Sequence, residues 1–243
     1  MTPSPFVQAG ARIRFEWGLG GLSALLDDLD APAVVVVVVD VLSFSTAVVV
    51  ACEAGVLVRP TALDPSPDVP PGALLAGVRG DGRVSLSPGS LGSLDRGTRV
   101  VLPSPNGGAI AAAAAARGAR VLVGSIRNGS ATRARLRRLL TTDGDSTAIV
   151  IAAGERWPDG SLRPALEDAS GAAAVIEGLP VGWLSPEAAA MATGRIDLAA
   201  VADCGSAREL RDRGFSADVA VALKRDASTI VPELVDGWFR PAG

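Results

Sequence analysis

Asp40 is the first residue whose position suggests chemistry, because it ends a run of six valines, Val34 to Val39. A carboxylate is costly to bury unpaired, so water, a cation or a hydrogen-bond network must hold it there. Ser43, Ser45 and Thr46 follow at a predicted helix start, where hydroxyls and free backbone amides suit a phosphate. The simpler alternative is that Asp40 or Ser43 only caps the helix.

Carboxylates also gather in the stretch from Ala152 to Leu179. Glu155 and Arg156 follow a predicted strand, and Glu167 and Asp168 are adjacent on the helix that returns. Adjacent helical residues point roughly 100° apart, so we expect one of these two to face the site while the other is solvated or caps. Carboxylates without a nearby His or Cys suit a hard cation, Mg²⁺ in particular. A surface network of ion pairs explains the spacing equally well.

Further polar groups follow other predicted strands. The segments "LPSPNGGAIA" and "GSIRNGSATR" each contain a serine, an Asn-Gly step and then a helix. In an open parallel sheet, ligands bind beyond the carboxyl ends of the strands, where such loops converge. The candidates for substrate or phosphate binding are Ser43, Arg79, Ser104, Asn106, Arg127, Asn128 and Arg156.

These groups must be positioned by βα units. Short valine-rich runs alternate with Ala/Leu segments at helical spacing, which predicts an α/β fold with a largely parallel sheet, in one domain over residues 1–243. Strands are predicted at Ile13 to Glu16, Val34 to Val39, Leu57 to Val58, Leu74 to Ala76, Arg99 to Leu102, Val121 to Val123, Thr147 to Ala152, Leu198 to Val201 and Ala217 to Val221. Helices are predicted at Leu22 to Leu29, Ser45 to Ala54, Gly108 to Arg117, Ser130 to Leu140, Pro164 to Glu177, Pro186 to Thr193 and Ser206 to Arg213. The tail from Ile230 to Phe239 is predicted to be a last helix or turn, docked by Trp238 and Phe239.

The composition excludes several function classes. The chain has no histidine, so it is not a Ser-His-Asp hydrolase, a His phosphoenzyme or a His-ligated zinc protein. The formal charge of −3 argues against a general nucleic-acid binder. The basic segment from Arg133 to Leu140 is most simply a solvated helix face with its leucines turned inward. Cys52 and Cys204 lie too far apart for a disulfide framework or a metal site, and both are expected to be inert.

The sequence also bears on location and assembly. No segment reaches the roughly 20 apolar residues of a membrane span, and the N-terminus lacks the pattern of a secretory signal. We therefore expect a cytoplasmic protein that does not bind membranes. A homodimer is expected from the frequency of dimers among soluble oligomers.

Five motifs in register resemble the 2-phosphosulfolactate phosphatase (ComB) family. They are "VVVDVLSFSTAVVVACEAG", "LPSPNGGAIA", "GSIRNGSATRARL", "AAGERWPDGSLRPALEDASGAAAVI" and "DVAVALKRDASTIVPEL". The resemblance extends from about Ile13 to Trp238. It implies a three-layer α/β/α sandwich and a Mg²⁺-dependent phosphomonoesterase that converts 2-phospho-3-sulfolactate to sulfolactate and phosphate, a step in coenzyme M synthesis.

The same resemblance implies roles for individual residues. Asp40, Asn106, Glu155, Glu167 and Asp168 match the metal and phosphate site. Asp40 with one of the other three carboxylates would hold Mg²⁺, and a neighbouring carboxylate would orient or deprotonate water. Direct attack by Asp40 on phosphorus is a second possibility.

Arginines and backbone amides would hold the rest of a multiply anionic substrate. The candidate arginines are Arg79, Arg127 and Arg156. Two motifs depart from the family: Val78 stands where it commonly has Glu, and "LSPGSL" stands where it often has Gly-Asn-Ser-Pro. Because an acid is missing, the main alternative is a non-catalytic binding protein for a phosphorylated metabolite.

Overall fold

A nine-stranded sheet runs through the computed structural model, which describes residues 5–64, 66–194 and 197–243. Its strands, in spatial order, are β1 (Ile13–Trp17), β7 (Thr147–Ala152), β2 (Val34–Val39), β6 (Arg120–Gly124), β10 (Pro232–Val235), β11 (Trp238–Pro241), β3 (Leu57–Thr61), β5 (Arg99–Pro103) and β4 (Ala73–Leu75). Five of the eight neighbouring pairs are parallel and three are antiparallel. The predicted, largely parallel sheet is therefore confirmed.

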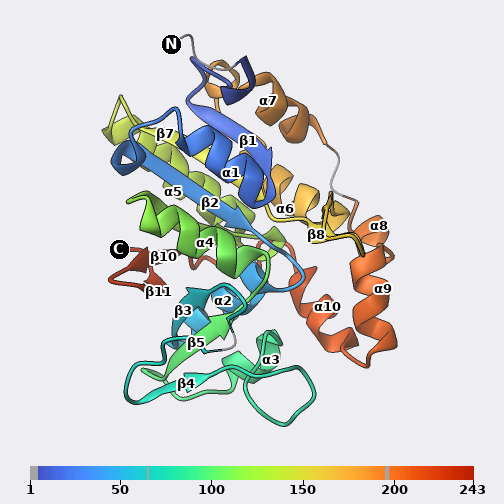
Figure 1. Cartoon of the computed structure of the whole chain (residues 1–243). Helices are drawn as coiled ribbons and strands as arrows, with labels where there is room; N and C mark the ends of the chain where they lie inside the picture. The colour runs from blue at the N-terminus through green and yellow to red at the C-terminus, as the bar shows by residue number, and fades with distance from the viewer. Residues whose placement is uncertain (1–4, 65, 195–196) are drawn as a thin grey trace.

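The valine run explains why two layers of helices cover the sheet. All six valines of β2 are buried, and successive side chains of a strand point to opposite faces. Val34, Val36 and Val38 join a core cluster with α1 (Gly18–Leu26), α2 (Phe44–Ala54) and α4 (Gly107–Ala116). Val35, Val37 and Val39 join a second cluster with α5 (Gly129–Thr142), α6 (Leu166–Ile176) and α7 (Pro186–Thr193). Figure 1 shows α1 and α4 on one side of β2 with α5 and α6 on the other, so the molecule is a three-layer α/β/α sandwich.

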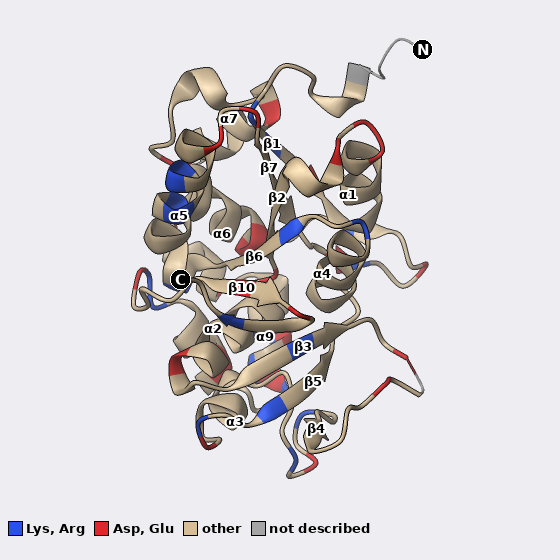
Figure 2. Ribbon diagram, turned by 90° about the vertical axis from the view of Figure 1, so that its left-hand side faces the viewer, with Lys and Arg blue, Asp and Glu red and all other residues tan. Residues whose placement is uncertain are grey.

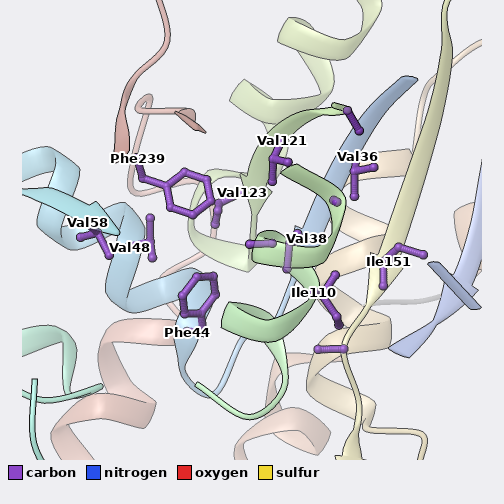
Figure 3. Close-up of a cluster of buried hydrophobic side chains, with 14 of the residues drawn as sticks. Val36, Val38, Phe44, Val48, Val58, Ile110, Val121, Val123, Ile151 and Phe239 are labelled. Atoms are coloured by element: carbon purple, nitrogen blue, oxygen red, sulfur yellow. The ribbon is translucent and has the colours of Figure 1, made fainter. Parts of the chain in front are cut away.

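The C-terminal tail differs from the prediction. It forms the hairpin β10–β11, which pairs antiparallel with β6 on one side and β3 on the other. The expected helix or turn is therefore wrong, because pairing with two distant strands decides the conformation and no local pattern records it. Phe239 does dock: its ring is fully buried and meets Phe44 edge-on at 6.2 Å between centroids (Figure 3).

Two further predicted strands are helices. The segments Leu198 to Val201 and Ala217 to Val221 lie in α8 (Leu198–Ala202) and α10 (Ser216–Ala222), which flank α9 (Gly205–Asp212). Short apolar runs cannot be assigned by periodicity alone. At α8, the Asp197 carboxylate accepts hydrogen bonds from the amides of Ala199 and Ala200, which caps a helix start.

The basic face of α5 behaves as predicted. Leu136 and Leu140 are fully buried, while Arg137 and Arg138 are exposed; Figure 2 shows the basic residues along α5. Arg135 pairs with Glu233 of β10 at 2.8 Å. Among the described residues, no helix is long and apolar enough to cross a membrane.

The remaining elements are small. They are β8 (Glu155–Arg156) and β9 (Leu162–Arg163), which form a separate antiparallel hairpin, the short helix α3 (Pro88–Gly92), and the 3₁₀ turns η1 (Pro5–Val7), η2 (Ala31–Ala33), η3 (Ile126–Asn128) and η4 (Val181–Trp183).

Candidate active site

Asp40 lies where β2 ends and α2 begins, and both of its carboxylate oxygens accept backbone hydrogen bonds. Oδ1 accepts from the amide of Phe44 at 3.2 Å, and Oδ2 accepts from the amide of Gly107 at 2.8 Å. The first bond is the cap that the sequence suggested. The second joins the end of β2 to the loop after β5, so Asp40 does more than cap its own helix.

Gly107 is the residue that makes this approach possible. A Cβ atom there would lie 2.7 Å from Asp40 Oδ2 and 2.6 Å from the ring of Phe44. Both are closer than side-chain contacts allow, so only glycine lets the loop after β5 reach the carboxylate.

Burial and like charges raise the pKa of Asp40. The residue is 7% exposed, and desolvation together with the nearby Glu167 carboxylate raises its pKa to about 6, against the lowering effect of the two amides and of Arg79. A cation that binds beside this carboxyl group would stabilise its ionised form.

Asp168 connects two strand ends. Its Oδ1 accepts from the amide of Val41 at 2.7 Å, and its Oδ2 accepts from the amide of Gly154 at 2.8 Å. Desolvation, and then the Asp40 and Glu167 carboxylates, raise the pKa of Asp168 well above its ordinary value. This side chain therefore fixes the loops after β2 and β7 relative to each other.

Glu167 is buried as deeply as its neighbour. It is 2% exposed and Asp168 is 3% exposed, so neither carboxylate is solvated; of the two expected alternatives, capping fits Asp168, whose oxygens accept two backbone amides. The first turn of α6 packs into the strand ends, where the positive end of the helix dipole favours carboxylates. The Cys204 thiol donates to Glu167 Oε2 at 3.2 Å, and desolvation raises the pKa of that thiol to about 11, which keeps it a donor.

Glu155 completes the acidic group at the start of β8. Desolvation, and then the Asp40 and Glu167 carboxylates, raise its pKa to about 7, opposed by Arg163 and by a hydrogen bond from Asn106. Asn106 Nδ2 donates to Glu155 Oε2 at 3.3 Å. The structure thus brings together Asp40, Asn106, Glu155, Glu167 and Asp168, which we call the acidic site.

Arg79 brings a cation to the same place. Its Nη2 donates to Ser43 Oγ and to the carbonyl of Leu86, and its Nε donates to Asp218 Oδ2 at 3.1 Å. The guanidinium also lies 5.7 Å from the centre of the Phe215 ring. Burial lowers the pKa of Arg79, while the paired Asp218 carboxylate keeps the charge favourable.

Asp218 was missed by sequence reasoning. It is buried in α10 and accepts from both Arg79 and Ser87 Oγ, the latter at 2.6 Å. Its segment read as a strand, and its partners lie more than 130 residues away in the chain, so no local signal marks it.

Four predicted substrate contacts have other surroundings. Arg127 forms an ion pair with Glu53 at 3.0 Å. Arg156 is exposed, and its guanidinium donates a hydrogen bond to the carbonyl of Gly160. Asn128 is fully buried and bonded to the Ser125 amide and to the carbonyls of Val123 and Ile230. Ser104 is buried beside the start of α4, and its backbone amide donates a hydrogen bond to the carbonyl of Thr61. Arg127 and Asn128 thus have partners outside the acidic site.

Two pockets flank the loop after β5, and Pro105 lines both. One, of about 560 Å³, is bounded by Asn106, Glu155, Arg156 and the start of α1. The other, of about 580 Å³, is bounded by Arg79, Arg83 and Arg213. The first pocket therefore meets the acidic site at Asn106 and Glu155, and the second meets Arg79.

The carboxylates suit a hard cation in kind and charge. Within the described ranges no three or more Cys, Asp or Glu side chains are placed to form a ready metal cage. Mg²⁺ does not need one, because it usually takes one or two carboxylates and completes its shell with water and substrate phosphate. Asp40, Glu155, Glu167 and Asp168 are the side chains that could supply those ligands. Each oxygen of Asp40 and of Asp168 accepts one backbone amide, which leaves it a second lone pair for a cation.

A family model described as 2-phosphosulpholactate phosphatase matches residues 82–237. The match covers well over half of the chain and includes Asn106, Glu155, Glu167 and Asp168. No curated protein matches the chain.

Proposed function

Because the chain belongs to the 2-phosphosulpholactate phosphatase family, a family of phosphoric monoester hydrolases, we propose that it is a Mg²⁺-dependent phosphomonoesterase. Its substrate would be 2-phospho-3-sulfolactate or a related small anionic phosphate ester, and its products the alcohol and inorganic phosphate. The observation that carries this proposal is the acidic site, where burial and mutual repulsion raise the pKa of three carboxyl groups. Such a group of carboxylates is stabilised when a cation joins it.

In this proposal Asp40 and Glu167 hold Mg²⁺. Both side chains are buried, and the negative charge of Glu167 raises the pKa of Asp40. Bound there, the metal supplies positive charge to the phosphoryl oxygens. Asp168 holds the loops after β2 and β7 in place through the amides of Val41 and Gly154.

Arg79 and Ser43 bind the phosphate in the same scheme. The guanidinium is held by Asp218 and reaches Ser43 at the start of α2. Since phosphoryl transfer depends mainly on positioning and charge neutralisation, a fixed guanidinium beside hydroxyl and amide donors suits it.

Glu155 would act as the general base. Its pKa of about 7 lies near neutral pH, where a base combines a useful ionised fraction with a strong pull on the proton. It takes a proton from the water that attacks phosphorus, the P–O ester bond breaks, and the alcohol oxygen leaves with a proton taken from solvent water. Asn106 holds one oxygen of Glu155, which orients the other.

Phosphate release tests the activity directly. Purified protein is stripped with EDTA and assayed on 2-phospho-3-sulfolactate and on an aryl phosphate, before and after addition of Mg²⁺ or Mn²⁺. We expect no activity in the stripped protein and recovery with either metal. Full activity in the stripped protein would contradict the metal assignment, and phosphate-ester binding without turnover would favour the non-catalytic alternative.

The wider assignments belong to the same proposal. We propose a cytoplasmic protein, a homodimer, and a role in coenzyme M synthesis, with no nucleic-acid or membrane partner. Size-exclusion chromatography with light scattering tests the dimer, and loss of sulfolactate in a deletion strain tests the role.

A further inference from the structure

Positive charge gathers in the second of the two pockets beside the loop after β5, which we call the arginine pocket. Its volume is about 580 Å³. Among the described residues, the charged side chains on its wall are three arginines and one acid: Arg79, Arg83, Arg213 and Asp64. The other pocket has Arg156 and Glu155 on its wall. The arginine pocket therefore presents the stronger positive field to an anion.

Arg79 keeps free donors beside this pocket. Its Nε donates to Asp218, and its Nη2 donates to Ser43 and to the carbonyl of Leu86. Within the part of the chain that the structure describes, no acceptor is hydrogen-bonded to Nη1. A guanidinium has five N–H groups in a planar fork. Arg79 can therefore bind a phosphate through Nη2 and a second oxyanion through Nη1.

Arg213 brings a second cation next to Arg79. It follows α9, and its guanidinium lies 5.7 Å from the centre of the Phe215 ring, the same distance as the Arg79 guanidinium. Burial lowers the pKa of Arg79, the Asp218 carboxylate raises it, and the positive charge of Arg213 lowers it. Phe215 thus supports two guanidinium groups whose charges interact.

The ion pair of Arg213 leaves it open to a ligand. Nη1 of Arg213 lies 3.2 Å from Glu209 Oε1, and the two side chains are 48% and 67% exposed. Exposed pairs of this kind contribute little free energy, so an oxyanion in the pocket can share or displace the Glu209 carboxylate. An anion bound between Arg79 and Arg213 would also offset the repulsion between them.

We propose that Arg213, together with Nη1 of Arg79, binds a second anionic group of the substrate and makes the protein select phosphate esters that carry one. The proposal rests on the proposed function, in which Arg79 binds the phosphate. The second group is a carboxylate or a sulfonate a few bonds from the ester oxygen, because one guanidinium contacts both anions. Arg213 determines specificity in this scheme and takes no part in the bond-breaking step.

Three phosphonates test the binding without turnover, because a methylene group replaces the ester oxygen. They are 2-(phosphonomethyl)-3-sulfopropanoate, which carries both further anions, 2-methyl-3-phosphonopropanoate, which carries the carboxylate alone, and isobutylphosphonate, which carries neither. Calorimetry with Mg²⁺ should show that the wild type binds the first at least tenfold more tightly than the third, since hydrogen bonds between charged groups are the stronger ones.

Arg213→Gln should reduce that difference to less than about threefold and weaken isobutylphosphonate less than twofold. Arg213→Lys keeps the charge and should recover part of the selectivity. Arg208→Gln is the matched control: Arg208 lies on α9, is exposed and pairs with Asp203, but it does not line the pocket. It should bind all three phosphonates as the wild type does.

The pattern of losses identifies the group that Arg213 binds. Weaker binding of the sulfonate analogue alone assigns Arg213 to the sulfonate, and weaker binding of both anionic analogues assigns it to the carboxylate; each supports the proposal. Equal effects of Arg213→Gln on all three phosphonates would overturn it. So would a loss of selectivity in Arg156→Gln that Arg213→Gln does not show, because the second anion would then lie in the other pocket.

Phosphate release separates this proposal from the proposed function. Arg213→Gln should lower kcat/KM about tenfold for 2-phospho-3-sulfolactate and less than twofold for isopropyl phosphate. Equal kcat/KM values of the wild type for the two esters would refute the selectivity and leave the phosphatase intact. Selective phosphonate binding through Arg213 with no phosphate release from either ester would support the anion subsite and refute the phosphatase.

Discussion

Replacing Asp40 by Asn tests whether the buried carboxylate carries a repulsive charge. The pKa of Asp40 rises from 3.8 to about 6 in the folded protein, so the neutral form is favoured on folding. The stability that this group contributes is fully present below its unfolded pKa and is lost as the pH rises through about 6. Asn carries no charge and does not titrate, so the variant escapes that loss.

The size of the effect follows from the shift in pKa. At 1.36 kcal/mol per unit, ionisation of Asp40 costs the folded state about 1 kcal/mol at pH 4.5 and about 3 kcal/mol at pH 8. Against this, an Asn amide can accept only one of the two backbone hydrogen bonds that Asp40 accepts, a loss of about 1–3 kcal/mol at every pH. Asp40→Asn should therefore be equal to or less stable than wild type at pH 4.5, and equal or more stable at pH 8.

Urea denaturation at the two pH values measures this difference. The stability of Asp40→Asn relative to wild type should rise by about 2 kcal/mol from pH 4.5 to pH 8. Asp95→Asn, an exposed control, should show no such change. Added Mg²⁺ should stabilise wild type at pH 8 but not Asp40→Asn, which should also lose most phosphatase activity. A relative stability that is constant between the two pH values would refute the reasoning.

Three further predictions concern the groups around Asp40. Glu155→Gln should lower kcat/KM by about 10²–10⁴-fold and remove the rise in activity with pH through about 7; an unchanged pH profile would exclude Glu155 as the base. At pH 4.5, Asp168→Asn should lower the melting temperature more than Glu167→Gln, because both Asp168 oxygens accept backbone amides, whereas at pH 8 Glu167→Gln should lose Mg²⁺ binding and the activity that depends on it; thermal melts and Mg²⁺ titrations would show the reverse if the roles are exchanged. Asp218→Asn should raise KM more than it lowers kcat, because it loosens Arg79, and Asp218→Glu should recover part of the loss; steady-state kinetics with equal effects on both constants would speak against a positioning role.

The elements that the sequence predicted well are those set by local periodicity. The valine strand and the strand from Thr147 to Ala152 have the predicted bounds, and α2 and α4 begin within one residue of theirs. The failures are the tail hairpin and α8 and α10, where packing against distant segments decides the conformation. The predicted carboxylates meet because strand ends and the start of α6 converge, which follows from the topology.

The repeated Asn-Gly motif shows why similar local patterns had different outcomes. Ser125 and Asn128 are three residues apart, and that spacing lets their side chains and backbone amides form a capping box. Ser104 and Asn106 are two residues apart, and Asn106 instead reaches Glu155. One residue of spacing therefore separates an asparagine that closes its own turn from one that contacts the acidic site.

The hydrogen bonds of the acidic site also extend the family assignment to residues that the family model does not cover. Asp40, Ser43 and Arg79 precede residue 82, where the match begins. Each is joined to the matched segment: Asp40 accepts from Gly107, Asp168 accepts from Val41, and Arg79 connects Ser43 to Asp218. Because the bonds of Asp40 and Asp168 are buried and those of Arg79 are partly buried, moving one side of the site would leave polar groups of the other side unpaired. The two parts therefore form one structural unit, and the proposed chemistry draws on Asp40 and Arg79 together with Glu155 and Glu167.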